Sequence, residues 1–216
     1  MLSLKNFTLH NGSKKLIDNL SFDIENGQVL SIMGPSGIGK SSLLSYLSGT
    51  LAPQLSAQGE VLLNQQAIHT KSIQSRKVGL LQQSPLLFPH MSILENLLFA
   101  IPEQMPKQQR AEQAHQALLK LGLADKACAM ADQLSGGQQA RVALLRTLLA
   151  QPDFLLLDEP FSKLDPALRR DVREFVLAEI RHANIPALLV THDAEDAKAM
   201  QGNCLDLKPF HPASKA

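Results

Sequence analysis

The fold of this chain is decided by one short stretch, Gly34-Pro35-Ser36-Gly37-Ile38-Gly39-Lys40-Ser41. It matches the pattern G-x-x-x-x-G-K-[ST], whose glycines let successive backbone N–H groups turn toward phosphate oxygens. The stretch follows a short apolar run, Val29–Met33, and precedes a predicted helix that stops at Gly49. Because the N-terminus of such a helix presents free N–H groups to the same anion, this order predicts a phosphate-binding loop.

Two side chains of the loop have the chemistry that a nucleoside triphosphate requires. The ammonium of Lys40 would place a positive charge between the β- and γ-phosphates, and the hydroxyl of Ser41 can ligate Mg²⁺. A glycine turn beside an incidental lysine is the alternative, which the position between a strand and a helix disfavours. We therefore expect a nucleoside triphosphate to bind to a contiguous set of residues: Gly34, Pro35, Ser36, Gly37, Ile38, Gly39, Lys40, Ser41 and Ser42.

A pair of carboxylates ends another apolar run. Asp158 and Glu159 follow Phe154–Leu157, a run typical of a strand that is buried on both faces. Parallel α/β sheets bind their ligands at the carboxyl ends of their strands. Asp158 is suited to the shell of a Mg²⁺ ion, and Glu159 could orient and deprotonate a water molecule aimed at the γ-phosphorus. The alternative is that both acids only cap the next turn in solvent.

The chain on either side of these motifs alternates between strand and helix patterns. Period-two runs with Asn-Gly turns favour strands in the first 35 residues, and a hairpin is predicted to turn at Asn64-Gln65. Helical spacing dominates from about residue 89 to residue 150, and within that range the polar, proline-containing stretch 101–109 is a candidate boundary. Asp165-Pro166 begins another helix. Ala187–Val190 is the last clear strand. This order predicts a parallel α/β sheet with an inserted helical lobe.

Composition excludes several classes of protein. The chain has 216 residues, of which 44% are hydrophobic and 19% charged, as in an ordinary globular protein. Its 21 Lys and Arg residues against 20 Asp and Glu residues give a net charge of +1, so no overall field would attract nucleic acid. No apolar run approaches the roughly 20 residues of a membrane-spanning helix, and polar residues interrupt the N-terminus too early for a signal peptide. Cys128 and Cys204 lack metal-ligand spacing and suit a reducing compartment.

One further string identifies a family. Leu134-Ser135-Gly136-Gly137-Gln138-Gln139-Ala140-Arg141 resembles the signature of the ATP-binding-cassette (ABC) ATPases. Ser135 is suited to be the N-cap of a helix whose N-terminus again offers an anion site. The resemblance implies that Ser135, Gly136, Gly137 and Gln138 face the γ-phosphate bound to a second subunit, and thus a homodimer that holds two ATP molecules between its subunits.

Three other stretches resemble family motifs in the expected order. The stretch that ends in Phe88-Pro89-His90 resembles the Q-loop, which makes Gln83, rather than Gln82, the glutamine that reaches Mg²⁺ and the attacking water. Ser162-Lys163-Leu164-Asp165 resembles the D-loop, with lysine where alanine is more usual, and implies that Asp165 belongs to the nucleotide site. Thr191-His192-Asp193 resembles the switch region, and implies that His192 contacts the γ-phosphate. For Gln83 and His192, the alternative is an ordinary polar surface residue.

The resemblance covers about residues 2–207 and implies an α/β, P-loop NTPase (RecA-like) fold. Its parallel-sheet core with an N-terminal antiparallel β-subdomain would comprise residues 1–85 and 150–207, its inserted α-helical subdomain 86–149, and a flexible tail 208–216. One feature departs from the family, which stacks adenine on an aromatic ring where this chain has Asn11. His10 could stack instead, whereas Phe7 is expected in the core.

The function that the resemblance implies is that of a bacterial transport ATPase. The subunit would hydrolyse ATP with Mg²⁺, in the cytoplasm at the inner face of the cell membrane, bound to integral membrane permease subunits and served by an extracytoplasmic solute-binding protein. An importer is favoured over a short exporter-type or lipoprotein-release ATPase. A soluble ABC ATPase of DNA repair or translation and a regulator that does not hydrolyse ATP are the remaining candidates. The sequence does not name the cargo.

Overall fold

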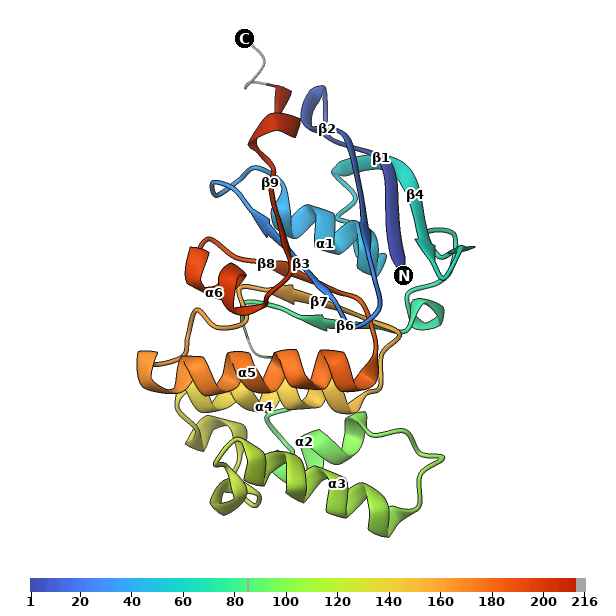
Figure 1. The fold of residues 1–216 in the computed structure, drawn as a ribbon. Helices are drawn as coiled ribbons and strands as arrows, with labels where there is room; N and C mark the ends of the chain where they lie inside the picture. Colours follow the sequence, from blue (N-terminus) through green and yellow to red (C-terminus); the bar gives the residue numbers. More distant parts are fainter. Residues whose placement is uncertain (85, 213–216) are drawn as a thin grey trace.

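The computed structural model describes residues 1–84 and 86–212, which form two sheets with helices packed against them (Figure 1). The central sheet is parallel throughout, so the carboxyl ends of all its strands lie at one edge. Its strand order is β6-β7-β8-β3-β9. The strands are β3 (Val29–Met33), β6 (Val78–Leu81), β7 (Phe154–Asp158), β8 (Ala187–Val190) and β9 (Asn203–Asp206).

The central strands are apolar because both faces of this sheet are covered. Successive side chains of a strand point to opposite faces. In β7, Leu155 and Leu157 belong to the core that includes the helices after residue 90, whereas Leu156 belongs to the core that includes the helix after the phosphate loop. All three side chains are fully buried. An uninterrupted apolar run, rather than an alternating one, is therefore what this position in the fold requires.

The second sheet is antiparallel and contains the N-terminus. Its strand order is β2-β1-β4-β5. The hairpin predicted at Asn64-Gln65 is present, and β1 and β2 form a second hairpin that turns at Gly12, one of the predicted Asn-Gly turns. Its apolar side chains share one core with the helix that follows the phosphate loop. The strands are β1 (Leu2–Asn11), β2 (Lys14–Ile24), β4 (Leu55–Leu63) and β5 (Gln66–Ala67).

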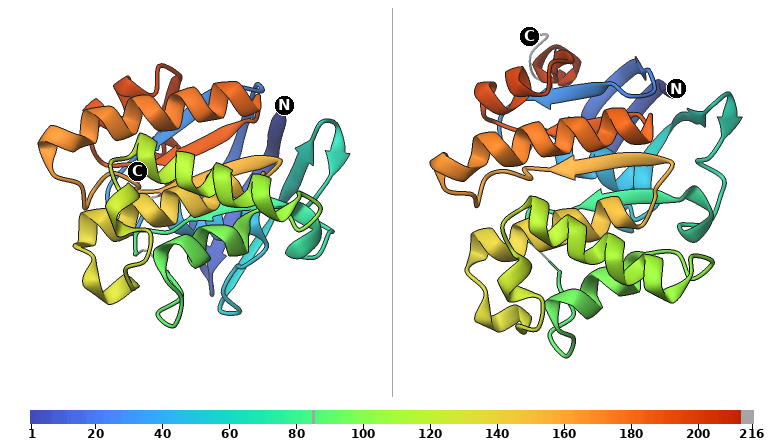
Figure 2. Two further views of the ribbon diagram at one scale, coloured as in Figure 1. Left: turned by 90° about the horizontal axis from the view of Figure 1, so that it is seen from below. Right: turned by 60° about the horizontal axis from the view of Figure 1, so that its bottom comes forward.

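The helices lie in two groups (Figures 1 and 2). α1 packs with the antiparallel sheet, whereas α2 and α3 lie at the opposite end of the molecule from β1 and β2. α4 contacts α2 and α3 and also β6, so the last helix of the segment 86–149 is packed on the central sheet as well. The helices are α1 (Lys40–Ser48), α2 (Ile93–Ala100), α3 (Lys107–Lys120), α4 (Gly136–Leu149), α5 (Pro166–Ala183) and α6 (Ala194–Ala199).

Several boundaries differ from the predicted ones. α3 begins at Lys107, inside the polar stretch 101–109 whose composition indicates a boundary, and Ala187–Val190 is not the last strand, since β9 follows it. In the expected tail, Lys208–Phe210 form a 3₁₀ turn, and Phe210 packs against the core. Residues 213–216 lie outside the described part. Within the described ranges, no helix combines the length and the apolar character needed to cross a bilayer.

Candidate active site

The phosphate loop joins the carboxyl end of β3 to the first residue of α1. Gly34, Gly37 and Gly39 have φ angles of 151°, 80° and 111°, which side-chain-bearing residues rarely adopt. Gly39 is also tightly enclosed, because a Cβ atom at this position would lie 3.1 Å from Ile17 Cδ1 and 3.3 Å from Leu9 Cδ2. Glycine is therefore required at residue 39 both by the backbone and by the neighbouring strands.

No side chain caps the first turn of α1, so its N–H groups remain available. Gly39 is the N-cap, no side chain accepts a hydrogen bond there, and the first turn contains no acidic residue. The first turn thus adds no carboxylate of its own at the positive end of the helix dipole, which suits an anion. The buried Lys40 lies within the loop, where its Nζ donates to the carbonyl oxygens of Gly34 at 2.7 Å and Pro35 at 3.0 Å.

Asp158 ends β7 next to this loop and is half-buried. Burial raises the pKa of its carboxyl above the usual range; the Ser41 hydrogen bond opposes this shift, the charge of Glu159 adds to it, and Lys40 opposes it. Mg²⁺ prefers oxygen ligands and is commonly held by one or two carboxylates together with substrate phosphates. The hydroxyl of Ser41, the carboxylate of Asp158 and the amide oxygen of Gln83 fit that donor set, whereas the described residues contain no group of three His, Cys, Asp or Glu side chains arranged for a metal.

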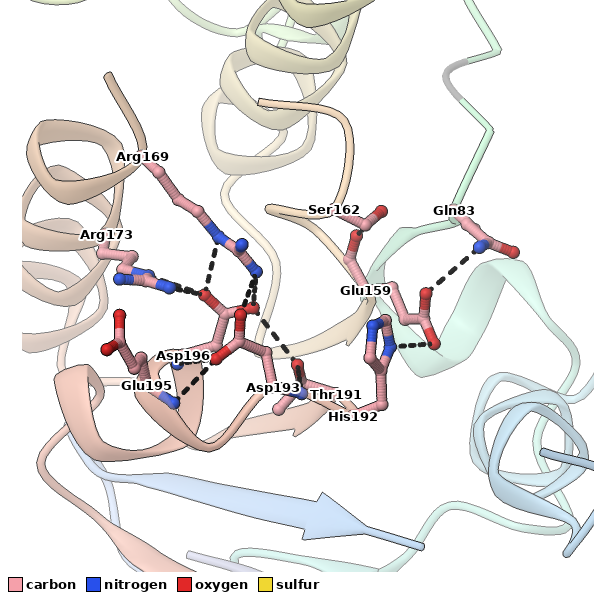
Figure 3. Close-up of polar contacts among 10 residues, drawn as sticks. All are labelled: Gln83, Glu159, Ser162, Arg169, Arg173, Thr191, His192, Asp193, Glu195 and Asp196. Carbon is pink, nitrogen blue, oxygen red and sulfur yellow. Dashed lines mark hydrogen bonds and ion pairs between the residues drawn. The ribbon is translucent and has the colours of Figure 1, made fainter. Parts of the chain in front are cut away.

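Glu159 stands one residue beyond the strand, where three neighbouring strand ends meet. Its Oε2 accepts a hydrogen bond of 3.1 Å from Nε2 of Gln83, which follows β6, and its Oε1 lies 3.0 Å from Nδ1 of His192, which follows β8 (Figure 3). The Glu159 backbone has a φ of 48°, in the left-handed region. Three residues that lie far apart in the sequence are thus brought together, and Gln83 rather than Gln82 makes the contact.

One cleft of about 310 Å³ is bounded by the phosphate loop on one side and the carboxylates on the other. Leu16 of β2, which the sequence did not suggest, also lines it. His10 and Asn11 do not, and Phe7 is fully buried against Tyr46, with 4.9 Å between the ring centroids. The predicted residues that line the cleft are Ser36, Gly37, Gly39, Lys40, Ser41, Ser42, Gln83, Asp158 and Glu159.

The signature residues and Asp165 are not part of that lining. Ser135 is the N-cap of α4, as predicted, and forms a capping box, in which its Oγ accepts from the Gln138 N–H at 3.3 Å and Gln138 Oε1 accepts from the Ser135 N–H at 2.9 Å. Ser135 and Gly136 are exposed. Asp165 is the predicted N-cap of α5, and its Oδ1 accepts from the Leu168 N–H at 3.1 Å. A single copy of the chain therefore does not bring these residues to its own phosphate loop.

Comparison with known proteins identifies the family. A family model described as ABC transporter matches residues 17–162, which is more than half of the chain. The chain belongs to the ABC transporter family. It is accordingly an ATP-binding subunit with ATPase chemistry, and the resemblance seen in the sequence is confirmed.

Curated relatives match over nearly the whole chain. The chain is 45% identical over 199 residues to the uncharacterized ABC transporter ATP-binding protein YnjD of Escherichia coli (strain K12), covering 92% of each. It is 40% identical to the Fe(3+) ions import ATP-binding protein FbpC of Pasteurella multocida (strain Pm70), covering 92% of this chain and 56% of that one. It is 38% identical to the spermidine/putrescine import ATP-binding protein PotA of Marinobacter nauticus, covering 96% and 55%. The chain therefore spans a little over half the length of these two importer subunits.

Solved structures confirm the fold class. The dimeric structure of a post-hydrolysis state of the ATP-binding cassette MJ0796 bound to ADP and Pi superposes with a TM-score of 0.81 at 29% sequence identity, covering 96% of this chain and 94% of that one. A second dimeric structure of MJ0796, a bacterial ABC transporter cassette, gives a TM-score of 0.82 with the same identity. The mixed α/β architecture with one parallel and one antiparallel sheet is that of an ABC ATPase.

Proposed function

We propose that this chain is the motor subunit of a bacterial ABC importer. Two copies would close head to tail around two ATP molecules, and hydrolysis would reopen them and drive a separate integral membrane permease. The observation that carries this proposal is the contact of Glu159 with both Gln83 and His192 beside the phosphate loop. FbpC and PotA are named as import ATP-binding proteins, which supports inward transport.

The hydrolytic step would depend on few side chains. The phosphate loop and Lys40 would hold the triphosphate, and a Mg²⁺ ion held by Ser41, Asp158 and Gln83 would neutralise charge on the phosphate oxygens when bound. Glu159 would accept a proton from the attacking water, since its carboxylate stands at the end of the cleft and carries hydrogen bonds from two sides. His192 would hold Glu159 in place and contact the γ-phosphate.

The absence of the signature residues and Asp165 from the lining of the cleft supports a dimer. Ser135, Gly136, Gly137 and Gln138 lie at an exposed helix start that does not line the cleft of their own chain. A second copy placed head to tail would bring this start, together with Asp165, to the γ-phosphate held by the first. The dimeric state of the matching MJ0796 structures supports this arrangement.

A permease would dock on the segment that follows Gln83. Leu86 and Phe99 are 63% and 65% exposed there and would offer a permease two large apolar side chains, which supports this location. The segment is held from beneath by the buried Asn96, whose Oδ1 accepts from the Phe88 N–H at 2.8 Å and whose Nδ2 donates to the Met91 carbonyl at 3.2 Å. Docking would place the subunit at the inner face of the cell membrane, with a solute-binding protein on the outer side.

The substitution Glu159→Gln tests the proposal. It removes the base but retains the shape, so we expect turnover to fall about 100-fold or more, ATP binding to persist and a dimer to accumulate with ATP. Phosphate release, equilibrium ATP binding and light scattering measure the three quantities. The matched control is Glu174→Gln, an exposed glutamate paired with Arg170 on α5. Normal turnover by Glu159→Gln would remove Glu159 from its proposed role, and a chain that stays monomeric with ATP would contradict the dimer.

A further inference from the structure

A dense group of charged side chains joins α5 to α6, next to but outside the cleft (Figure 3). Asp196 of α6 is 1% exposed. Its two carboxylate oxygens accept from Arg169 Nε at 3.0 Å and Arg169 Nη2 at 2.6 Å, and Oδ1 also accepts from Arg173 Nε at 2.6 Å. We call Arg169, Arg173 and Asp196 the α5–α6 cluster.

The cluster is rigid for electrostatic reasons. A buried carboxylate is stable only when cations or hydrogen-bond donors compensate it, and the planar guanidinium of Arg169 matches the carboxylate of Asp196 with two parallel bonds. Burial by itself would lower the pKa of Arg169, but the hydrogen bonds and charge of Asp196 outweigh burial and raise it. Arg169 therefore stays charged, and α6 cannot move away from α5 without uncovering Asp196.

The cluster fixes both neighbours of His192. The Thr191 hydroxyl donates to Asp196 Oδ2 at 3.2 Å and accepts from the Asp193 N–H at 3.1 Å. Asp193 Oδ2 forms an ion pair with Arg169 Nη2 at 3.0 Å. The His192 side chain itself is 66% exposed, so surrounding packing does not set its direction. The backbone that carries it is what holds its Nδ1 within reach of Glu159.

The same helix also lies against the chain segment after Glu159, where the Arg173 guanidinium is 6.0 Å from the ring centroid of the fully buried Phe161. Within that segment, the Ser162 hydroxyl donates to the Glu159 carbonyl at 2.8 Å. This segment continues to Asp165, the N-cap of α5. One helix thus contacts the loop that carries Glu159 and the loop that carries His192.

We infer that Arg169 and Arg173 are positioning residues for ATP hydrolysis, which act through Asp196 and Thr191 to hold His192 against Glu159. The inference rests on the proposed function, because it assigns these side chains a part in the reaction of that site. It also gives the segment 162–165 a route to His192, since a shift of this segment moves the first turns of α5, and Arg169 and Arg173 with them. A purely structural cluster would stabilise the fold without this effect.

The test compares substitutions within the full chain by steady-state ATP hydrolysis. Arg173→Lys keeps the charge but loses the planar fork, and Thr191→Val keeps the shape but loses the hydroxyl. We expect each to lower kcat about tenfold or more, because small displacements of reacting groups have effects of this size. KM for ATP is expected to change less than about twofold, since the cluster does not line the cleft. Thr191→Ser, which restores the hydroxyl, should restore kcat.

Two further measurements separate positioning from stability. Arg170→Lys changes an exposed arginine on the same helix and is expected to leave kcat and KM unchanged. In the His192→Ala background, adding Arg173→Lys should cause no further loss of kcat, because residues that act through one another are not additive. Should Arg173→Lys fail to fold in thermal melting, the Thr191→Val and Thr191→Ser pair decides the question.

The outcomes for this inference and for the proposed function are distinct. If Glu159→Gln loses turnover while Arg173→Lys and Thr191→Val retain full kcat, the inference is overturned and the proposed function stands. The inference is also overturned if kcat falls only in proportion to the melting temperature. A further loss of kcat when Arg173→Lys is added to His192→Ala would overturn it as well. If Glu159→Gln hydrolyses ATP normally, the proposed function fails, and the inference fails with it.

Discussion

Two helices of this chain begin at a glycine-rich turn, yet their first turns are completed in different ways. α1 begins after Gly39, which is left-handed and offers no side chain to its N–H groups. α4 begins after Ser135, whose hydroxyl and backbone exchange hydrogen bonds with Gln138 in a capping box. The first helix start lies at a cleft of its own chain, whereas the second is exposed and lines no part of that cleft.

The difference is consistent with the two roles proposed for these motifs, in which the start of α1 binds the phosphates directly and the start of α4 meets them only in a dimer. An uncapped helix start beside Lys40 has N–H groups and positive charge ready for an anion without any partner. A start with a capping box is stable before an anion arrives, because its own side chains satisfy the N–H groups of Ser135 and Gln138. A helix start of this kind is stable while exposed, and a second copy of the chain could then contact it.

The largest effect is expected from Gly39→Ala. The substitution forces an alanine to a φ of 111° and brings its Cβ against Ile17. We expect a loss of about 2 kcal/mol in the free energy of unfolding and a fall of about 30-fold in ATP affinity, since a similar energy is lost in forming the loop. Urea unfolding and titration with a fluorescent ATP analogue measure the two.

Two alanine variants serve as comparisons for Gly39→Ala. Gly122 is also left-handed, with a φ of 63°, but a Cβ atom there would meet no other atom within 4 Å, so Gly122→Ala should weaken folding while ATP affinity stays unchanged. Gly136 at α4 has open space and no positive φ, so Gly136→Ala should fold as well as the native chain. Equal ATP affinity for Gly39→Ala and the native chain would show that the loop tolerates a side chain and would remove the contrast with α4.

A smaller effect is expected from Ser135→Asp, which separates capping from anion binding. Aspartate is as good an N-cap as serine, so the free energy of unfolding should stay within about 0.5 kcal/mol. A carboxylate would repel a triphosphate, so ATP turnover should fall roughly tenfold or more while ATP binding by a single chain is retained. Ser135→Ala is the control, because it removes the cap without adding charge. Full turnover by Ser135→Asp would mean that α4 does not meet the triphosphate.

The smallest effect on the free energy of unfolding is expected from Asp158→Asn, which removes the carboxylate at the end of β7 beside the phosphate loop. A raised folded-state pKa favours protonated Asp158, so its contribution to stability is present at low pH and lost as pH rises through the folded pKa. Asp158→Asn should therefore be more stable than the native chain at neutral pH, by about 1 kcal/mol in the free energy of unfolding. The gain should vanish near and below about pH 4, the ordinary aspartate range. Adding Mg²⁺ to the ATP-bound chain should stabilise the native chain more than the variant, and an unchanged melting curve at neutral pH would contradict this account.

Much of the fold could be read from local signals. Asp165-Pro166 and Gly49 mark helix ends by backbone chemistry that is independent of the rest of the chain, and both lie where the sequence predicted them. β9 and α6 were not predicted, because each is short and its polar residues mask its pattern; β9 is a strand through its pairing with β3. Lys107 begins α3 after Pro106, and a polar first turn there resembles a linker until it packs.

The sequence indicated which residues belong to the candidate site, but not their backbone conformations or contacts. Motif spacing indicated Gln83, Glu159 and His192, yet the left-handed backbone at Glu159 has no signal in a glutamate. The cluster around Asp196 joins residues 23 and 27 positions apart, where charged side chains on a helix more often face solvent. Their meeting depends on how α5 and α6 dock, and docking is a property of the assembled sheet.

The left-handed backbone at Glu159 affects which substitutions the chain would tolerate at this position. Left-handed backbone is unfavourable for glutamate and readily adopted by glycine or asparagine. A change to either would relax the main chain at this corner, while the hydrogen bond from the Glu159 N–H to the Val190 carbonyl at 2.9 Å would be retained. With Glu159 in its proposed role as the base, either substitution would therefore give a more stable chain that still binds nucleotide but no longer hydrolyses it at the native rate.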